Sequence, residues 1–138
     1  MATFTKFNSF VEACAEKVHN LGSDTLKVML CDTAPVATNT VKADLTEISA
    51  GNGYTAGGTQ ATISSSSQTT GTYKLVLADV VFTATGAIGP FRYAVLYNDT
   101  ATNKELIGFW DYGSSISLAN GGTFTVDYDA GTGVLTLA

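Results

Sequence analysis

The stretch FRYAVLYNDTATNKELIGFWDY, residues 91–112, consists of two apolar segments separated by a short polar loop. Residues 91–98 and 105–112 are rich in aromatic and β-branched side chains, which are enriched in strands. Residues 99–103, DTATN, have the composition of a hairpin loop. The stretch therefore predicts a pair of antiparallel strands.

Strand-like segments and turns continue on both sides of this hairpin, at intervals of about ten residues. In residues 26–31, LKVMLC, alternate side chains are apolar, which predicts a half-buried strand and places strands from residue 25 onward. The chain is therefore predicted to be mainly β, as an antiparallel β-sandwich or barrel-like domain. Further strands are predicted at 59–64, 73–83 (as one strand or as two that separate near Asp79), 115–119, 123–128 and 134–137, with turns at 86–90, 120–122 and 129–133 and an exposed loop at 64–72.

One amphipathic helix is predicted near the N-terminus, over about residues 5–21. Apolar side chains recur there every three or four positions, so they fall on one helical stripe. Gly22 would end the helix, because glycine is favoured just beyond a helix C-terminus. No linker divides the sequence, so residues 1–138 are predicted to form a single domain. The apolar stripe consists of Phe7, Phe10, Val11, Cys14, Val18 and Leu21.

A long segment without clear periodicity, residues 33–58, separates the first predicted strand from the next. It contains Pro35, a predicted single helical turn within residues 42–48, and the glycine-rich sequence GNGYTAGG at 51–58, which predicts a flexible loop. Long irregular connections in compact domains usually carry a function. The segment is therefore predicted to be an extended arm or a contact loop.

Charged residues make up only 14% of the chain, and twelve acidic residues outnumber seven basic ones, giving a net charge of −5. This charge has the wrong sign for attraction to phosphates, and the low charged fraction argues against a helical bundle. The longest apolar run, near residues 75–82, is interrupted by Asp79 and is far shorter than the ~20 residues of a membrane span. The first residues lack the apolar stretch of a secretory signal, so synthesis in a cytoplasm is expected. Neither nucleic acid nor a membrane is predicted as a partner.

Two short motifs formally match ligand-binding patterns, and neither is complete. Residues 51–56, GNGYTA, match a dinucleotide fingerprint, but a β segment rather than the required helix is predicted to follow. Asp127-Tyr-Asp129-Ala-Gly131 begins like a calcium loop, yet Ala138 stands where that loop needs a bidentate glutamate. An acidic strand end is the default interpretation, and a weak cation site at Asp127 and Asp129 stays open. No cofactor, metal or small-molecule substrate is predicted.

Residues for catalysis are sparse. The single histidine, His19, falls near the end of the predicted helix, and no nucleophile motif accompanies it. Carboxylates such as Glu105 and Asp111 could act as an acid–base pair, but their spacing singles out no pair. The two cysteines, Cys14 and Cys31, lie in apolar surroundings and are predicted to be buried free thiols. The chain is therefore predicted not to be an enzyme, and no catalytic residue is assigned.

The densest aromatic group is Phe109-Trp110-Asp111-Tyr112. On a strand, Trp110 and Tyr112 share one face, while Phe109 and Asp111 share the other. One interpretation is that one face fills the core and the other is half exposed. The second is that Trp110 or Tyr112 anchors a protein interface, where aromatic residues are enriched.

Five short sequences follow the predicted N-terminal helix: LKVMLCD (26–32), DLTEI (44–48), GYTAGG (53–58), AVLYNDTATNKELIGFWDYG (94–113) and GVLTL (133–137). With these sequences, over roughly residues 26–137, the chain resembles small structural proteins of tailed-bacteriophage virions, in particular capsid decoration (cement) proteins. The resemblance implies a non-enzymatic protein of the capsid surface, made in the host cytoplasm. It also implies a homotrimer that binds the major capsid protein on the outside of the head and stabilises the shell.

Segment 33–58 and the aromatic group are predicted to contact other subunits or the capsid. Deleting residues 37–52 is then expected to abolish capsid binding and to leave the β core folded. Two alternatives remain: another virion component, such as a tail-tube, head–tail completion or fibre-base protein, and a carbohydrate- or cell-surface-binding β-sandwich module. The predicted interface residues are Asp44, Leu45, Ile48, Tyr54, Trp110 and Tyr112, of which the last two would form the platform of a carbohydrate-binding module.

Overall fold

The computed structural model describes residues 2–138, and its paired strands are antiparallel to their neighbours. The prediction of a mainly β chain with antiparallel sheets is confirmed. No helix within residues 2–138 has both the length and the apolar character needed to cross a membrane. The elements are β1 (Thr3–Lys6), α1 (Phe10–Ala15), β2 (Leu26–Cys31), the 3-10 turn η1 (Lys42–Asp44), β3 (Thr59–Ala61), β4 (Ile63–Thr69), β5 (Thr72–Leu77), β6 (Val80–Thr83), β7 (Ile88–Asn98), β8 (Leu106–Leu118), β9 (Thr123–Val126) and β10 (Leu135–Leu137).

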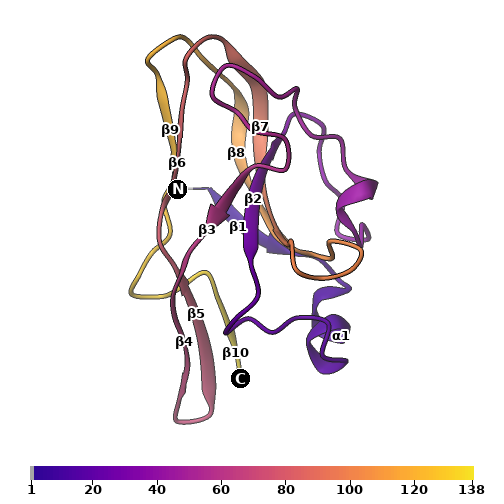
Figure 1. Cartoon of the computed structure of the whole chain (residues 1–138). Helices are drawn as coiled ribbons and strands as arrows, with labels where there is room; N and C mark the ends of the chain where they lie inside the picture. Colours follow the sequence, from indigo (N-terminus) through magenta and orange to yellow (C-terminus); the bar gives the residue numbers. More distant parts are fainter. Residues whose placement is uncertain (1) are drawn as a thin grey trace.

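The largest sheet has five strands in the order β1-β8-β7-β2-β3, and the predicted hairpin supplies β7 and β8 (Figure 1). Both strands are longer than predicted, because β7 already begins at Ile88 and β8 continues to Leu118. The turn predicted at 86–90 is therefore partly strand. Pro90, which has no N–H for the ladder, lies where the register between β7 and β8 shifts.

Two smaller sheets, β10-β5-β4 and β6-β9, pack against one face of the large sheet (Figure 1). The predicted strand 73–83 is divided into β5 and β6. At the division, the Asp79 carboxylate accepts a 2.9 Å hydrogen bond from the N–H of Tyr128, just beyond β9. A first core cluster lies between these layers. Its buried side chains from both layers include Val28, Phe91, Leu96, Leu75, Phe82 and Val126.

The opposite face of the large sheet carries a second cluster, so β2 is buried on both sides and not half-buried as predicted. Leu45 of segment 33–58 packs against this cluster, and Cys31 within it is fully buried. Burial, together with the Glu47 carboxylate, raises the pKa of the Cys31 thiol to about 12. Cys14 was also predicted to be buried, but it is partly exposed. The second cluster consists of Phe7, Met29, Cys31, Tyr93, Val95, Tyr97, Leu106 and Phe109.

The helix predicted over about residues 5–21 is wrong in extent, since α1 spans only Phe10–Ala15. Residues 3–6 form β1, which pairs with β8, because the edge of that strand offers backbone partners. The apolar residues do not share one stripe: Phe7 belongs to the second cluster and Phe10 to the first. Lys17 has a left-handed backbone (φ 66°), which helical residues do not adopt.

Residues 64–72 were predicted to form a loop, but most of them belong to β4. This serine- and threonine-rich strand pairs with β5 along one side, and the hairpin β4–β5 projects at the lower end of the molecule in Figure 1. Thr70 and Gly71 make the turn with positive φ values of 49° and 85°. Apolar alternation is missing because the strand lies at a sheet edge and faces solvent at most positions.

Candidate functional site

Segment 33–58 lies along the domain and does not extend from it. The N–H of Leu106 donates a 3.0 Å hydrogen bond to the carbonyl of Thr40, and the N–H of Ile48 donates one of 3.0 Å to the carbonyl of Leu30. The segment is thus tied to two strands of the large sheet. In the isolated chain the segment lies on the sheet, and its predicted role as an arm or contact loop stays a prediction.

Tyr54 is a core residue of this segment, with only 2% of its surface exposed. Its hydroxyl donates to a Glu47 carboxylate oxygen at 2.6 Å and accepts a 3.0 Å hydrogen bond from the N–H of Leu30. Glu47 also accepts from the N–H of Gly57 and pairs with Lys42 at 3.3 Å. Burial, followed by the bond to Glu47, strongly raises the pKa of Tyr54. Tyr54 therefore fixes the segment on the sheet and offers no surface to a partner.

Asp44, Leu45 and Ile48 also have internal partners. Asp44 is exposed, but its carboxylate accepts hydrogen bonds from the N–H groups of Thr40 at 2.9 Å and Val41 at 3.2 Å. These bonds lower the pKa of the Asp44 carboxyl, the one from Thr40 most, and they hold η1 in place within the predicted helical turn. Leu45 packs on the second cluster and Ile48 on the first, and both are partly exposed.

The most exposed large apolar side chain of segment 33–58 is Val36, at 55%. The sequence prediction did not include Val36, and nothing in the sequence distinguishes it from the other apolar residues of the segment, such as Leu45 and Ile48. Pro35 itself is buried. Val36 is therefore held outward by an anchored neighbour.

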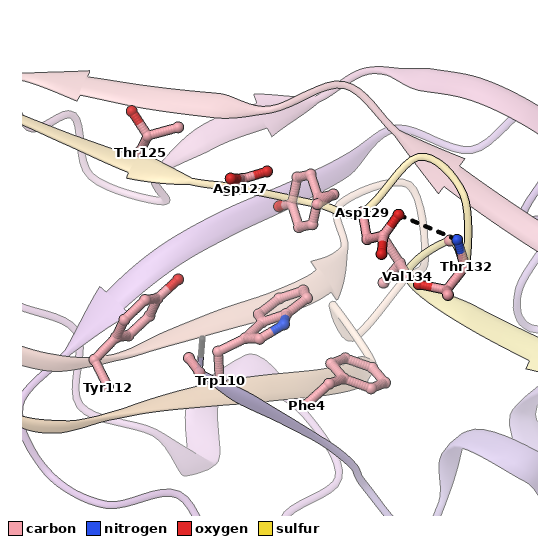
Figure 2. A pocket seen from close by; sticks show the side chains of 11 residues that line it. Phe4, Trp110, Tyr112, Thr125, Asp127, Asp129, Thr132 and Val134 are labelled. Carbon is pink, nitrogen blue, oxygen red and sulfur yellow. Dashed lines mark hydrogen bonds between the residues drawn. The ribbon is translucent and has the colours of Figure 1, made fainter.

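Trp110 and Tyr112 lie apart from this group, in a pocket of about 360 Å³ between β1, β8 and the chain around β9 and β10. In Figure 2, Tyr112, Trp110 and Phe4 form one side, and Thr125, Asp127 and Asp129 lie across from them. The Trp110 ring centroid is 4.9 Å from that of Phe4 and 5.3 Å from that of Tyr128. The pocket thus combines aromatic walls with carboxylates.

Trp110 and Tyr112 share one face of β8, as the alternation predicts, because both pack with the first cluster while Phe109 belongs to the second. Trp110 is only 7% exposed, since Phe4 and Tyr128 cover it. Tyr112 is partly exposed. The structure therefore places this face in the core at Trp110 and opens it toward the pocket at Tyr112.

Two polar groups of the pocket stand out. Tyr128 is only 6% exposed, and its buried hydroxyl has no hydrogen-bond partner among the described residues. Burial, with smaller effects of Tyr112 and Asp79, strongly raises the pKa of Tyr128. Burial and the nearby Asp127 carboxylate raise the pKa of Tyr112 to about 12. Both hydroxyls therefore stay protonated at neutral pH, able to donate and to accept.

The second aspartate of the calcium-like motif serves the local turn. The Asp129 carboxylate accepts hydrogen bonds from the N–H groups of Gly131 at 2.7 Å and Thr132 at 3.2 Å. These bonds, that of Gly131 first, lower the pKa of Asp129. Among residues 2–138, no group of three or more metal-ligating side chains is suited to hold an ion. Asp127 is exposed at the pocket rim, at the end of its strand as expected.

His19 belongs to a buried polar cluster and not to a nucleophile pair. Its Nδ1 lies 3.0 Å from the Asn98 side-chain amide, which also donates to Asp24 at 2.6 Å. Burial lowers the pKa of His19, and the Glu105 and Asp24 carboxylates partly oppose this. Both His19 Nε2 and one Glu105 oxygen are buried without a partner. Sequence reasoning missed Asn98, which lies in the hairpin that it did predict.

Asp111, the other carboxylate considered for acid–base chemistry, forms a two-bond ion pair with Arg92, at 2.7 and 3.0 Å. The Arg92 bond is the main reason that the pKa of Asp111 is lowered. Asp111 is thus held as a carboxylate across the β7–β8 pair. Glu105 instead faces the His19 cluster, so the structure does not join the two into an acid–base pair.

Comparison with known proteins adds no relative: no protein-family model, curated protein or solved structure matches this chain. The candidate sites are therefore the two surfaces that the geometry defines. One is the outer side of segment 33–58 around Val36, and the other is the pocket of Trp110 and Tyr112.

Proposed function

We propose that this chain is a non-enzymatic structural protein of a tailed-bacteriophage virion, which binds the outer surface of the head and stabilises the capsid shell. Its partners are the major capsid protein and copies of itself in a homotrimer. The resemblance of residues 26–137 to virion proteins carries the proposal. The same proposal assigns the layered sheets to the β-sandwich class.

Several structural features support a role in assembly. The polar groups that could serve chemistry instead hold the fold: Asp44 binds its turn, Glu47 binds Tyr54, and Asp111 binds Arg92. A surface with few charges loses few hydrated ions when it packs against a neighbour. Many equivalent copies on a shell also need only a modest contact each.

The outer side of segment 33–58 is the proposed capsid contact. The deletion of residues 37–52 is not a suitable test, because it removes Glu47, the partner of Tyr54, and Leu45, which covers the second cluster. The β core is therefore expected to unfold in that deletion, contrary to the expectation from sequence. Point substitutions at exposed positions test the contact without this effect.

The proposal is tested on purified virions of the phage that encodes the chain. Electron microscopy with antibody labelling is expected to find many copies over the head, and the free protein is expected to sediment as a trimer of the 14.3 kDa chain. Copies confined to the tail or to the head–tail junction would support one of the alternative virion components. Absence of the chain from the particle would overturn the proposal.

Val36→Glu is expected to weaken binding to heads at least tenfold, because a charge in a packed apolar contact costs about 1.4 kcal/mol or more. The matched control is Val81→Glu on β6, since Val81 is similarly exposed, at 51% against 55% for Val36. Co-sedimentation with heads that lack the protein measures the effect, and thermal unfolding confirms that both variants fold. Equal binding by both variants, or a loss with Val81→Glu alone, would contradict the assigned face.

The carbohydrate-binding module remains a second candidate, because Trp110 and Tyr112 line one pocket with carboxylates. Sugars usually stack on an exposed aromatic face, and Trp110 is only 7% exposed. Glycan binding by the isolated chain that is lost in Trp110→Ala would favour this module over the virion protein.

A further inference from the structure

We infer that the pocket of Phe4, Trp110, Tyr112, Asp127 and Tyr128 binds the guanidinium group of an arginine side chain presented by a partner protein. This goes beyond the proposed function, because it assigns a ligand to a site that the capsid contact at segment 33–58 does not use. It applies to the isolated chain, whatever particle the chain belongs to.

The walls of the pocket fit a flat cation. Four aromatic side chains, Phe4, Trp110, Tyr112 and Tyr128, line a volume of about 360 Å³. Trp110 packs between Phe4 and Tyr128, with centroid distances of 4.9 and 5.3 Å, and Tyr112 packs against Phe124 at 4.9 Å, so each ring is supported by a neighbour. A guanidinium group is planar and weakly hydrated, and it binds aromatic rings through stacking and cation–π attraction.

The charge of the pocket also favours a cation. Asp127 lies at its rim, and the ion pairs found among residues 2–138 engage Asp99, Glu47 and Asp111 but not Asp127. The Asp127 carboxylate is close enough to Tyr112 to contribute to the raised pKa of that hydroxyl. A carboxylate beside aromatic rings, in a chain of net charge −5, attracts a positive group.

The buried hydroxyl of Tyr128 gives the second, independent indication. Tyr128 lines the pocket and is only 6% exposed, and its buried hydroxyl has no hydrogen-bond partner among the described residues. An unpartnered buried hydroxyl costs free energy that a ligand can recover. A guanidinium has five N–H donors and no acceptor, so it can donate to Tyr128 and to the Asp127 carboxylate together.

The test is a titration of the full chain with argininamide, followed by tryptophan fluorescence, because Trp110 is the only tryptophan. A saturable change is expected in the millimolar range, the scale on which single side-chain fragments bind. Citrullinamide, which has a similar shape without the charge, is expected to bind at least tenfold more weakly. Free N-acetyltryptophanamide serves as the control for non-specific quenching.

Three variants locate the effect. Asp127→Asn is expected to weaken argininamide binding at least tenfold, whereas Glu16→Gln, the same charge change at an exposed residue outside the pocket, leaves it unchanged. Tyr128→Phe keeps the ring and is expected to weaken binding severalfold without lowering the melting temperature, because the lost hydroxyl had no partner in the free protein.

The inference is overturned if argininamide gives no saturable change up to about 100 mM, far above the affinity expected for a fitting fragment. It is also overturned if citrullinamide binds equally well, or if Asp127→Asn binds argininamide as the unaltered chain does. Saturable binding of methyl glucoside in place of argininamide would likewise overturn it and would assign the pocket to a neutral sugar. Circular dichroism of each variant shows that it is folded.

Discussion

Gly58→Ala is expected to lower the free energy of unfolding by roughly 3–5 kcal/mol, a large part of the 5–15 kcal/mol that stabilises a typical domain. Gly58 has a left-handed backbone (φ +81°), and a Cβ there would lie 1.8 Å from the carbonyl oxygen of Val28. That oxygen belongs to β2, which pairs with β3 on one side and β7 on the other. The strand therefore cannot move away without breaking a ladder.

Urea unfolding followed by Trp110 fluorescence measures this loss. Gly71→Ala is the matched control, because Gly71 also has a positive φ, of +85°, and nothing lies within 4 Å of its added Cβ. It should show only the backbone cost of an L-residue in this conformation, about 1 kcal/mol. If the two variants unfold at the same urea concentration, the close approach of Gly58 to Val28 does not hold in solution.

This glycine also illustrates what the sequence could not reveal. The sequence GNGYTAGG predicts a flexible loop, because glycines cluster in mobile turns. In the structure, Gly58 lies against Val28, while a Cβ on Gly53 would lie 2.2 Å from the carbonyl oxygen of Thr83. Glycine permits either mobility or close backbone contact, and only the neighbouring strands decide which applies.

Local patterns were read correctly where both partners are close in sequence. The hairpin of residues 91–112 follows from two apolar runs and one polar loop, and it forms the middle of the large sheet. The prediction of a helix over 5–21 was wrong because its apolar residues belong to two different core clusters, and the spacing of apolar residues in a sequence does not show which cluster each one joins. Strand β1 exists because an edge of β8 is available, and that edge lies about a hundred residues further along the chain.

The candidate pocket was predictable only for the two residues that are close together in the sequence. Alternation along one strand places Trp110 and Tyr112 on the same face. Phe4 and Tyr128, by contrast, reach the pocket from β1 and from the chain after β9, so only the tertiary structure brings them together. The missing hydrogen bond of the Tyr128 hydroxyl has no counterpart in the sequence at all.

Asn98→Ala is the second substitution with a large expected effect, a loss of about 3–5 kcal/mol of unfolding free energy. Asn98 is fully buried, and its side chain makes four hydrogen bonds. The amide nitrogen donates to His19 Nδ1 and to Asp24, which are 79 and 74 positions away. The amide oxygen accepts from the N–H groups of Thr100 and Ala101, at 3.0 and 3.2 Å.

Alanine leaves all of these partners without the amide, and each buried group that stays unpaired costs about 1–3 kcal/mol. Asn103→Ala in the same loop is the matched control, because Asn103 is exposed and its amide donates only to Glu105 at 3.3 Å; its expected cost is below about 0.5 kcal/mol. Asn98→Asp replaces the donating amide nitrogen with a carboxylate oxygen 2.6 Å from the Asp24 carboxylate in a fully buried position. Two like charges there repel each other, so a loss at least as large as that of Asn98→Ala is expected at neutral pH. Chemical unfolding measures the free energy of unfolding of the three variants. A cost of Asn98→Ala no greater than that of Asn103→Ala would mean that water replaces the amide and that the cluster does not hold the loop to the sheet.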